Sequence, residues 1–229
     1  MKKTKTKKSE GFSLIELLIA MTLMLVLLGI VSTLFSRSLG VRARESRRTD
    51  ALTSAQAALN VMSREIANSG FGLYADSVSK RALNGIVIAD SSANKIHFRS
   101  NIVNIKTASP LPPDDINKPG EDITYYFDSV TNSILRYDAH AVYNSSTNTY
   151  TPQSSVIINR ISNVSFDYFN YSGSVSTPTK TTTPTVDTGR VTITVIVNLE
   201  PVQGQPDNQK VTFSSDVTLR NSNYMLNQY

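Results

Sequence analysis

The chain has 229 residues, of which 40% are hydrophobic and 18% charged, which suffices for one membrane segment and one modest globular domain but not for two large domains. It contains no cysteine, which excludes disulfide bonds, thiolate nucleophiles and cysteine metal sites. The formal net charge is +5, but five lysines and one glutamate in the first ten residues supply +4 of it. The remaining 18 basic and 17 acidic residues nearly balance, which argues against generic nucleic-acid binding through a basic surface.

An apolar run follows the lysine-rich leader. The 24 residues from 12 to 35 contain a single charged side chain, Glu16. At about 1.5 Å per residue such a helix extends about 36 Å, more than the roughly 30 Å of a hydrocarbon core. The run is too long for a secretory signal peptide, so we expect it to span a membrane. The lysines before it favour a cytoplasmic N-terminus, although an arginine cluster follows closely.

The junction of the leader and the apolar run carries the motif Gly11-Phe12-Ser13-Leu14-Ile15-Glu16. This motif resembles the type III signal of type IV prepilins. The resemblance implies that a prepilin peptidase cuts after Gly11 and that the new amino terminus, Phe12, is N-methylated. Glu16 would then be the fifth residue of the mature chain. Unlike some major pilins, the apolar run has no proline.

Glu16 needs an explanation, because a lone carboxylate in hydrocarbon costs at least a few kcal/mol. Cleavage would create a positive amine at Phe12, one helical turn away, which offers a compensating charge. The first turn of a helix also favours an anion. In a filament, the family resemblance implies that Glu16 pairs with the Phe12 amine of a neighbouring subunit during assembly. The alternative is that Glu16 lies near the membrane interface and extends toward the head groups without a partner.

The helical pattern continues beyond the apolar run as one apolar stripe with spacings of three and four. We therefore predict one helix from residue 12 to about residue 68, ended at Gly70. The arginine cluster suits lipid head groups or acidic neighbours, and it lacks the interleaved aromatic residues of a nucleic-acid site. The stripe comprises Leu52, Ala55, Leu59, Met62 and Ile66, and the cluster comprises Arg37, Arg42, Arg44, Arg47 and Arg48.

Beyond residue 72 the periodicity changes to two, in short runs rich in Val, Ile, Tyr and Phe, which predicts strands. The clearest pair is a hairpin within residues 122–139, with its turn at 129–132. Stretches 110–119, 144–152 and the Ser/Thr/Pro-rich 171–189 are predicted loops. The predicted strands are 85–89, 95–99, 123–128, 133–137, 156–161, 164–171, 191–199 and 211–219.

The residues offer little for catalysis or metal binding. His97 and His140 are the only histidines, and we expect both to be ordinary strand or loop residues because neither has acidic neighbours at ligand spacing. The pairs at 114–115 and 121–122 lack the alternating oxygen ligands of a calcium loop. No Ser/His/Asp arrangement, P-loop or GxGxxG motif is present. We predict no catalytic residue, no metal, no cofactor and no enzymatic activity.

The end of the predicted helix and the β-rich part of the chain resemble the PilW-type minor pilins and the J-type pseudopilins of type II secretion. The resemblance lies in the stretches "REIANSGFGL", "ILRYD", "ISNVSFDYFNYSG" and "VTLRN". This resemblance implies an α+β, pilin-like fold, in which a long N-terminal helix packs on an antiparallel β-sheet domain. The implied organisation is a leader peptide at 1–11, a transmembrane half of the helix at 12–36, an extramembrane half at 37–68 and a β-rich domain at 69–229.

The function implied is that of a minor pilin of a type IV pilus, assembled into the filament or at its tip, with roles in initiation, adhesion or motility. The alternatives are a type II secretion pseudopilin and a DNA-uptake or adhesive pilin whose loops bind a ligand. The implied partners are other pilin subunits, the prepilin peptidase, the inner-membrane assembly platform and, before assembly, membrane lipid, and we expect no nucleic acid. The implied location is the bacterial inner membrane, crossed once, and later the pilus or a periplasmic pseudopilus.

Overall fold

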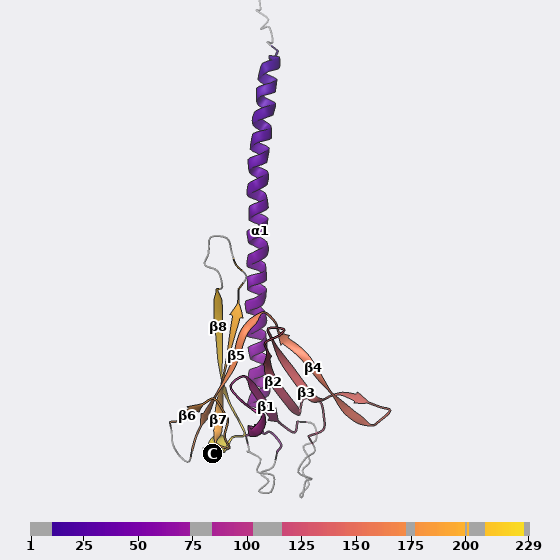
Figure 1. The fold of residues 1–229 in the computed structure, drawn as a ribbon, viewed down its shortest axis with the longest axis vertical. Coiled ribbons are helices and arrows are strands. Elements are labelled where there is room, and N and C mark those ends of the chain that lie inside the picture. Colours follow the sequence, from indigo (N-terminus) through magenta and orange to yellow (C-terminus); the bar gives the residue numbers. More distant parts are fainter. Residues whose placement is uncertain are drawn as a thin grey trace, which may run out of the picture. The chain divides into compact units, whose positions relative to one another are not determined.

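A computed structural model describes residues 11–73, 84–102, 116–172, 177–199, 201 and 209–226. Its first element is α1, Leu14–Ala67, a continuous helix of 54 residues, which confirms the single long helix predicted for 12–68 (Figure 1). The chain divides into two compact units, residues 1–47 and residues 48–229. The two units are described separately below.

The described part of the first unit comprises residues 11–47, which contain the apolar half of α1 and the first residues of the arginine cluster. Every large apolar side chain from Phe12 to Val41 is at least 51% exposed. Within the described residues, α1 is the one helix that is long and apolar enough to cross a membrane. A surface of this composition favours an apolar surrounding, because exposing it to water costs roughly 25 cal/mol for each Å².

The second unit begins with the rest of α1, whose predicted apolar stripe is buried. Ala55, Leu59, Met62 and Ile66 form part of one core with side chains from both sheets, and Leu52 packs against it. The helix ends in turns where Gly70 and Gly72 have φ angles of 79° and 67°, the left-handed region in which glycine has no steric penalty. This confirms the predicted stop at Gly70.

Two four-stranded antiparallel sheets make up the rest of this unit (Figure 1). The first has the order β1-β2-β3-β4, with β1 at Lys95–Arg99, β2 at Asp122–Asp128, β3 at Ser133–Asn144 and β4 at Thr149–Ile158. The second has the order β6-β5-β7-β8, with β5 at Ile161–Asn170, β6 at Thr179–Thr181, β7 at Thr188–Asn198 and β8 at Lys210–Thr218. Two short helices, η1 (Ile88–Asp90) and α2 (Asn223–Leu226), complete the described elements. The α+β, pilin-like arrangement predicted from sequence is therefore present.

Several strand predictions are confirmed and others are wrong. The hairpin β2–β3 is confirmed, with Asp128 opposite Ser133 and Asn132 at a φ of 50° in its turn. The predicted strand at 85–89 is instead a single bridge at Ile86 followed by η1. The predicted strand 156–161 is divided between the end of β4 and the start of β5, where Arg160 has a φ of 59°.

The predicted loops at 144–152 and 171–189 also hold strands. The first contains the start of β4, and the second contains β6 and the start of β7. Both segments are rich in polar and threonine residues, and β4 lies at the edge of its sheet, where most of its side chains are exposed. An edge strand that buries neither face has no apolar alternation, so the pattern does not reveal it.

Candidate functional site

The site predicted from the leader motif lies at the start of α1. Ser13 immediately precedes the helix, and its carbonyl oxygen accepts the first helical hydrogen bond, from the Leu17 N–H at 3.1 Å. The carboxylate of Glu16 turns back and accepts a hydrogen bond from the Ser13 N–H, also at 3.1 Å. Ser13 and Glu16 thus show the backward half of a capping box, in which the third helical residue satisfies the amide of the N-cap residue.

This contact gives Glu16 a role that the sequence analysis missed. The first N–H groups of a helix have no partner within the helix, and in hydrocarbon an unmade backbone hydrogen bond is expensive. The spacing Ser-x-x-Glu in Ser13-Leu14-Ile15-Glu16 was the available signal, since it is the capping-box pattern. The Glu16 carboxylate lies against the peptide N–H next to Phe12, the residue whose amine would be freed by cleavage.

Gly11 and Phe12 are both exposed, and Phe12 is 87% exposed. A Cβ atom built on Gly11 would meet nothing within 4 Å, so contacts within the described chain do not require glycine at this position. The peptide bond between the two residues is accessible. A requirement for a small residue here would come from a processing enzyme and not from the fold.

Comparison with known proteins bears on this same segment. The model of the prokaryotic N-terminal methylation motif matches residues 6–32. The match supports a type IV pilin-like or pseudopilin protein that is processed by prepilin peptidase and anchored in a membrane. Proteins with this motif are structural and not enzymatic. The chain matched no curated protein and no solved structure.

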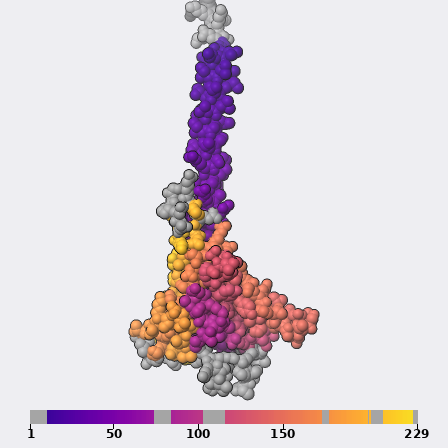
Figure 2. Space-filling model, viewed as in Figure 1, coloured from indigo at the N-terminus to yellow at the C-terminus, as the bar shows by residue number. Residues whose placement is uncertain are grey.

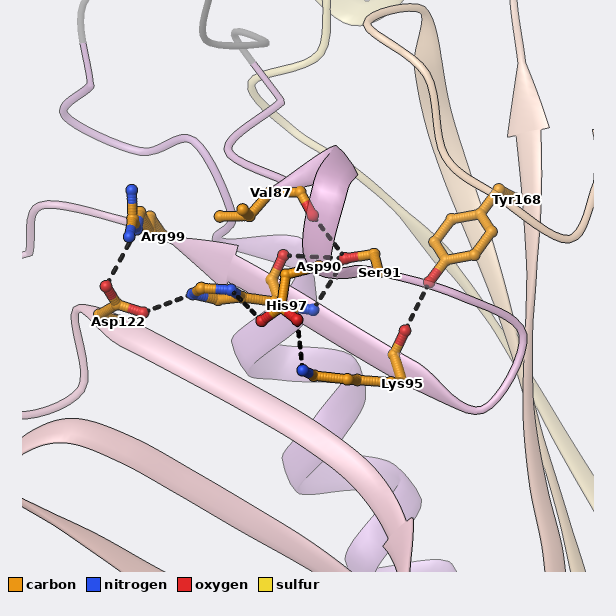
Figure 3. A network of polar contacts seen from close by, with 8 residues as sticks. All are labelled: Val87, Asp90, Ser91, Lys95, His97, Arg99, Asp122 and Tyr168. Carbon is orange, nitrogen blue, oxygen red and sulfur yellow. Dashed lines mark hydrogen bonds and ion pairs between the residues drawn. The ribbon is translucent and has the colours of Figure 1, made fainter.

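A polar network surrounds His97 on β1 (Figure 3). Its Nδ1 lies 2.8 Å from Asp90 Oδ2, and its Nε2 lies 2.6 Å from Asp122 Oδ1. Only a ring that carries protons on both nitrogens can donate to both carboxylates. Lys95 pairs with Asp90, and Arg99 Nε donates to Asp122 Oδ2 at 2.9 Å. His97 is a strand residue, as expected, and the two acidic side chains that meet it lie 7 and 25 positions away in the sequence.

The network lowers the pKa values of its two carboxylates, Asp90 and Asp122. Burial alone would raise the pKa of Asp122, but the hydrogen bond from His97 and the charge of Arg99 hold the pKa below its usual value. The balance is similar at Asp90, whose pKa is lowered by Lys95 and His97 against the effect of burial. These residues join η1, β1 and β2, and we interpret the network as a structural clamp.

A second network ties α1 to the first sheet within the second unit. Glu65 Oε2 accepts hydrogen bonds from the Tyr125 hydroxyl at 2.6 Å and from Arg136 Nε at 3.1 Å. Burial and the Glu65 charge both raise the pKa of Tyr125, so the tyrosine is a neutral donor. Arg136 also reaches Asp138 at 3.2 Å. The sequence pattern did not reveal the tyrosine and the arginine that meet Glu65 in the fold.

Two of the other acidic candidates, Glu121 and Asp122, have partners within the fold. The Glu121 carboxylate accepts hydrogen bonds from the N–H groups of Ile102 and Lys118, and Asp122 belongs to the His97 network. Asp114 and Asp115 lie outside the described residues. Within the described ranges, no group of three or more His, Cys, Asp or Glu side chains could hold a metal ion. His140 lies in β3, 43 positions after His97.

Proposed function

We propose that this chain is a minor pilin of a type IV pilus. The observation that carries the proposal is the methylation motif at residues 6–32 placed at the start of a long helix whose apolar half is exposed. Prepilin peptidase would remove residues 1–11 by cutting after Gly11, and Phe12 would be N-methylated. The subunit would wait in the inner membrane, held by residues 12–36, and would then join other pilin subunits through the assembly platform.

The β-rich part of the chain would be the portion that the filament displays. An exposed apolar half of a helix can be covered by lipid before assembly and by the helices of other subunits afterwards. Subunits related by a repeated head-to-tail operation form an open filament and not a closed ring. The proposed location is therefore the inner membrane first and the pilus or cell surface later.

Glu16 would have two functions in this scheme. In the single subunit its carboxylate accepts the Ser13 N–H, and in the filament it would compensate the Phe12 amine of a neighbour. The first function needs only an acceptor oxygen, which glutamine also supplies. The second needs a negative charge.

Two substitutions separate these functions. Glu16→Gln keeps the acceptor and loses the charge, whereas Glu16→Ala loses both. Both variants should insert into the membrane, because removing a charge makes insertion easier. The measurement is the amount of each variant in sheared filaments, compared at equal amounts in the membrane.

If the charge acts in assembly, both variants fail to enter filaments. Entry of Glu16→Gln at the parental level together with failure of Glu16→Ala would assign Glu16 to capping alone. Parental incorporation of both variants would contradict both functions and would favour a carboxylate that only extends toward the head groups.

A further inference from the structure

An open pocket of about 610 Å³ lies along the β3–β4 hairpin. The two strands extend beyond the others of their sheet (Figure 1), and the hairpin tip projects from the surface (Figure 2). This volume falls within the range of roughly 300–1,000 Å³ that is usual for small-molecule sites. The residues that line it include Lys118, His140, Tyr143, Asn148, Thr149 and Tyr150.

A bulge in β3 forms one wall of the pocket. Asp138 is paired with Gln153 and Val142 with Thr151, so residues 139–141 all lie opposite Pro152. Proline has no N–H to offer the ladder, and a bulge at such a position redirects the side chains of the opposite strand. His140 lies in this bulge and lines the pocket. Its Nδ1 is buried and has no hydrogen-bond partner among the described residues.

A lysine from the segment before β2 also lines the pocket. The Lys118 N–H donates to Glu121 Oε2 at 3.0 Å, and the nearby Gly120 N–H donates to Asp138 Oδ2 at 2.9 Å. These bonds fix the segment and also occupy the two carboxylates. Lys118 Nζ lies 5.0 Å from the centroid of the Tyr150 ring, within cation–π range. The described lining thus contains a lysine and no aspartate or glutamate.

Tyr143 presents an aromatic surface to this pocket. It is the cross-strand partner of Tyr150, and the ring centroids lie 5.1 Å apart. Its hydroxyl donates to Asn148 Oδ1 at 2.5 Å, which holds the ring in place. Even so, Tyr143 is 51% exposed. A cross-strand aromatic pair stabilises a hairpin by itself, but here the same pocket is also lined by His140 of β3 and by Lys118 from the segment before β2.

We propose that this pocket binds a saccharide unit that carries a carboxylate, of the hexuronate type. The C–H face of a sugar ring packs on an aromatic ring such as Tyr143, its carboxylate suits Lys118, and its hydroxyls find partners in Asn148, Thr149 and His140. A neutral sugar would offer the Lys118 ammonium group no anionic partner. A polynucleotide would need a row of cations along its phosphates, and the described lining supplies one lysine.

This inference rests on residues 117–153 and does not depend on the processing or assembly of the chain. Its failure would leave the proposed pilin function untouched, and the reverse also holds. The pocket would give a displayed subunit a preference for surfaces coated with acidic polysaccharide.

The test uses the full-length protein in mild detergent and measures binding by titration calorimetry. The probes are tetragalacturonate and a glucuronate-containing tetrasaccharide, each as the free acid and as the methyl ester, with tetraglutamate as an anion that has no sugar ring. We expect at least one free acid to bind at least about fivefold more tightly than its ester and than tetraglutamate. Equal binding of acid and ester, binding of tetraglutamate as tight as that of the acids, or no binding of either acid overturns the proposal.

Three variants locate the binding. Tyr143→Ala should weaken the binding of the acid about fivefold or more, which corresponds to about 1 kcal/mol or more, and Tyr143→Phe should keep the affinity near the parental value. Lys118→Gln should remove the preference for acid over ester. The matched control is Lys210→Gln, an exposed lysine at the start of β8, which should stay within about twofold of the parent.

Parental affinity in both Tyr143→Ala and Lys118→Gln would overturn the assignment to this pocket. A loss in Lys210→Gln as large as that in Lys118→Gln would show general charge attraction and would also overturn it. If Tyr143→Ala misfolds, judged by circular dichroism, Lys118→Gln decides the matter, because among the described residues the contact given for that side chain is the cation–π contact with Tyr150.

Discussion

At the scale of single residues, three acidic side chains of the described part of the chain are matched to specific donors. Glu16 accepts the Ser13 N–H, Glu65 accepts from Tyr125 and Arg136, and Asp122 accepts from His97 and Arg99. Hydrogen bonds to a charged acceptor are stronger than neutral ones. The sequence showed the types of these residues, but only the folded chain shows which donors meet them.

Removal of the Tyr125 hydroxyl tests the hydrogen bond that links the first sheet to Glu65 of α1. Tyr125 is fully buried, and Tyr125→Phe removes its bond to Glu65 while the ring stays. We expect the free energy of unfolding to fall by about 1–3 kcal/mol, measured by urea titration of the full-length protein in detergent. Tyr143→Phe removes a hydroxyl at an exposed site and should change the value by less than about 0.5 kcal/mol. Equal effects of the two substitutions would contradict the role of Glu65.

The His97 network predicts a dependence of stability on acid pH. The pKa of Asp122 is lower in the folded chain than its ordinary value of 3.8, so the folded state gains from ionisation of Asp122 above that value. This gain is lost as the pH falls through the folded-state pKa. Unfolding titrations across the acid range should show the loss in the parent and a smaller loss in Asp122→Asn. Asp50, which is exposed on α1, provides the control Asp50→Asn, and an unchanged acid slope in Asp122→Asn would refute the argument.

At the scale of elements, the sequence predicted those parts whose side chains alternate between core and solvent. The strand β5 has the burial pattern of a half-buried strand, and β7 repeats it, so both were found within a few residues. The polar edge strand β4 was missed over its first half because neither of its faces is buried there. The segment at Gly85 was mistaken for a strand because its valine and isoleucine residues carry the strand pattern, whereas the turn depends on a distant contact.

A substitution at Gly85 tests whether this turn depends on its close contact with Gly70 and Arg99. A Cβ atom on Gly85 would lie 2.1 Å from the Gly70 nitrogen and 2.5 Å from the Arg99 carbonyl oxygen, at a φ of 72°. Gly85→Ala should therefore lower the free energy of unfolding by several kcal/mol, or prevent folding, as followed by circular dichroism. Gly40→Ala is the matched control, since nothing lies within 4 Å of its added methyl group and alanine favours a helix. Equal stability of the two variants would mean that the turn at Gly70 does not pack against Gly85.

At the scale of the whole molecule, the chain separates an unburied apolar unit from a unit that has its own core. The core residues run from Ala55 to Leu219, all within the second unit, whereas the large apolar side chains from Phe12 to Val41 are exposed. The sequence predicted this division because a long apolar run and a two-residue periodicity are strong patterns. It did not predict two sheets or the pocket at the β3–β4 hairpin, because both depend on pairings between distant residues.

The central claim is that the exposed peptide bond between Gly11 and Phe12 is a processing site. Intact-mass measurement and fragmentation of the amino-terminal peptide, on protein made in cells with active prepilin peptidase, test it most directly. We predict a chain that begins at Phe12 and carries one added methyl group on its amine, and a full-length, unmethylated chain when the peptidase is absent. Retention of residues 1–11 in the presence of the peptidase, or a cut elsewhere such as after Ser36, would contradict the account.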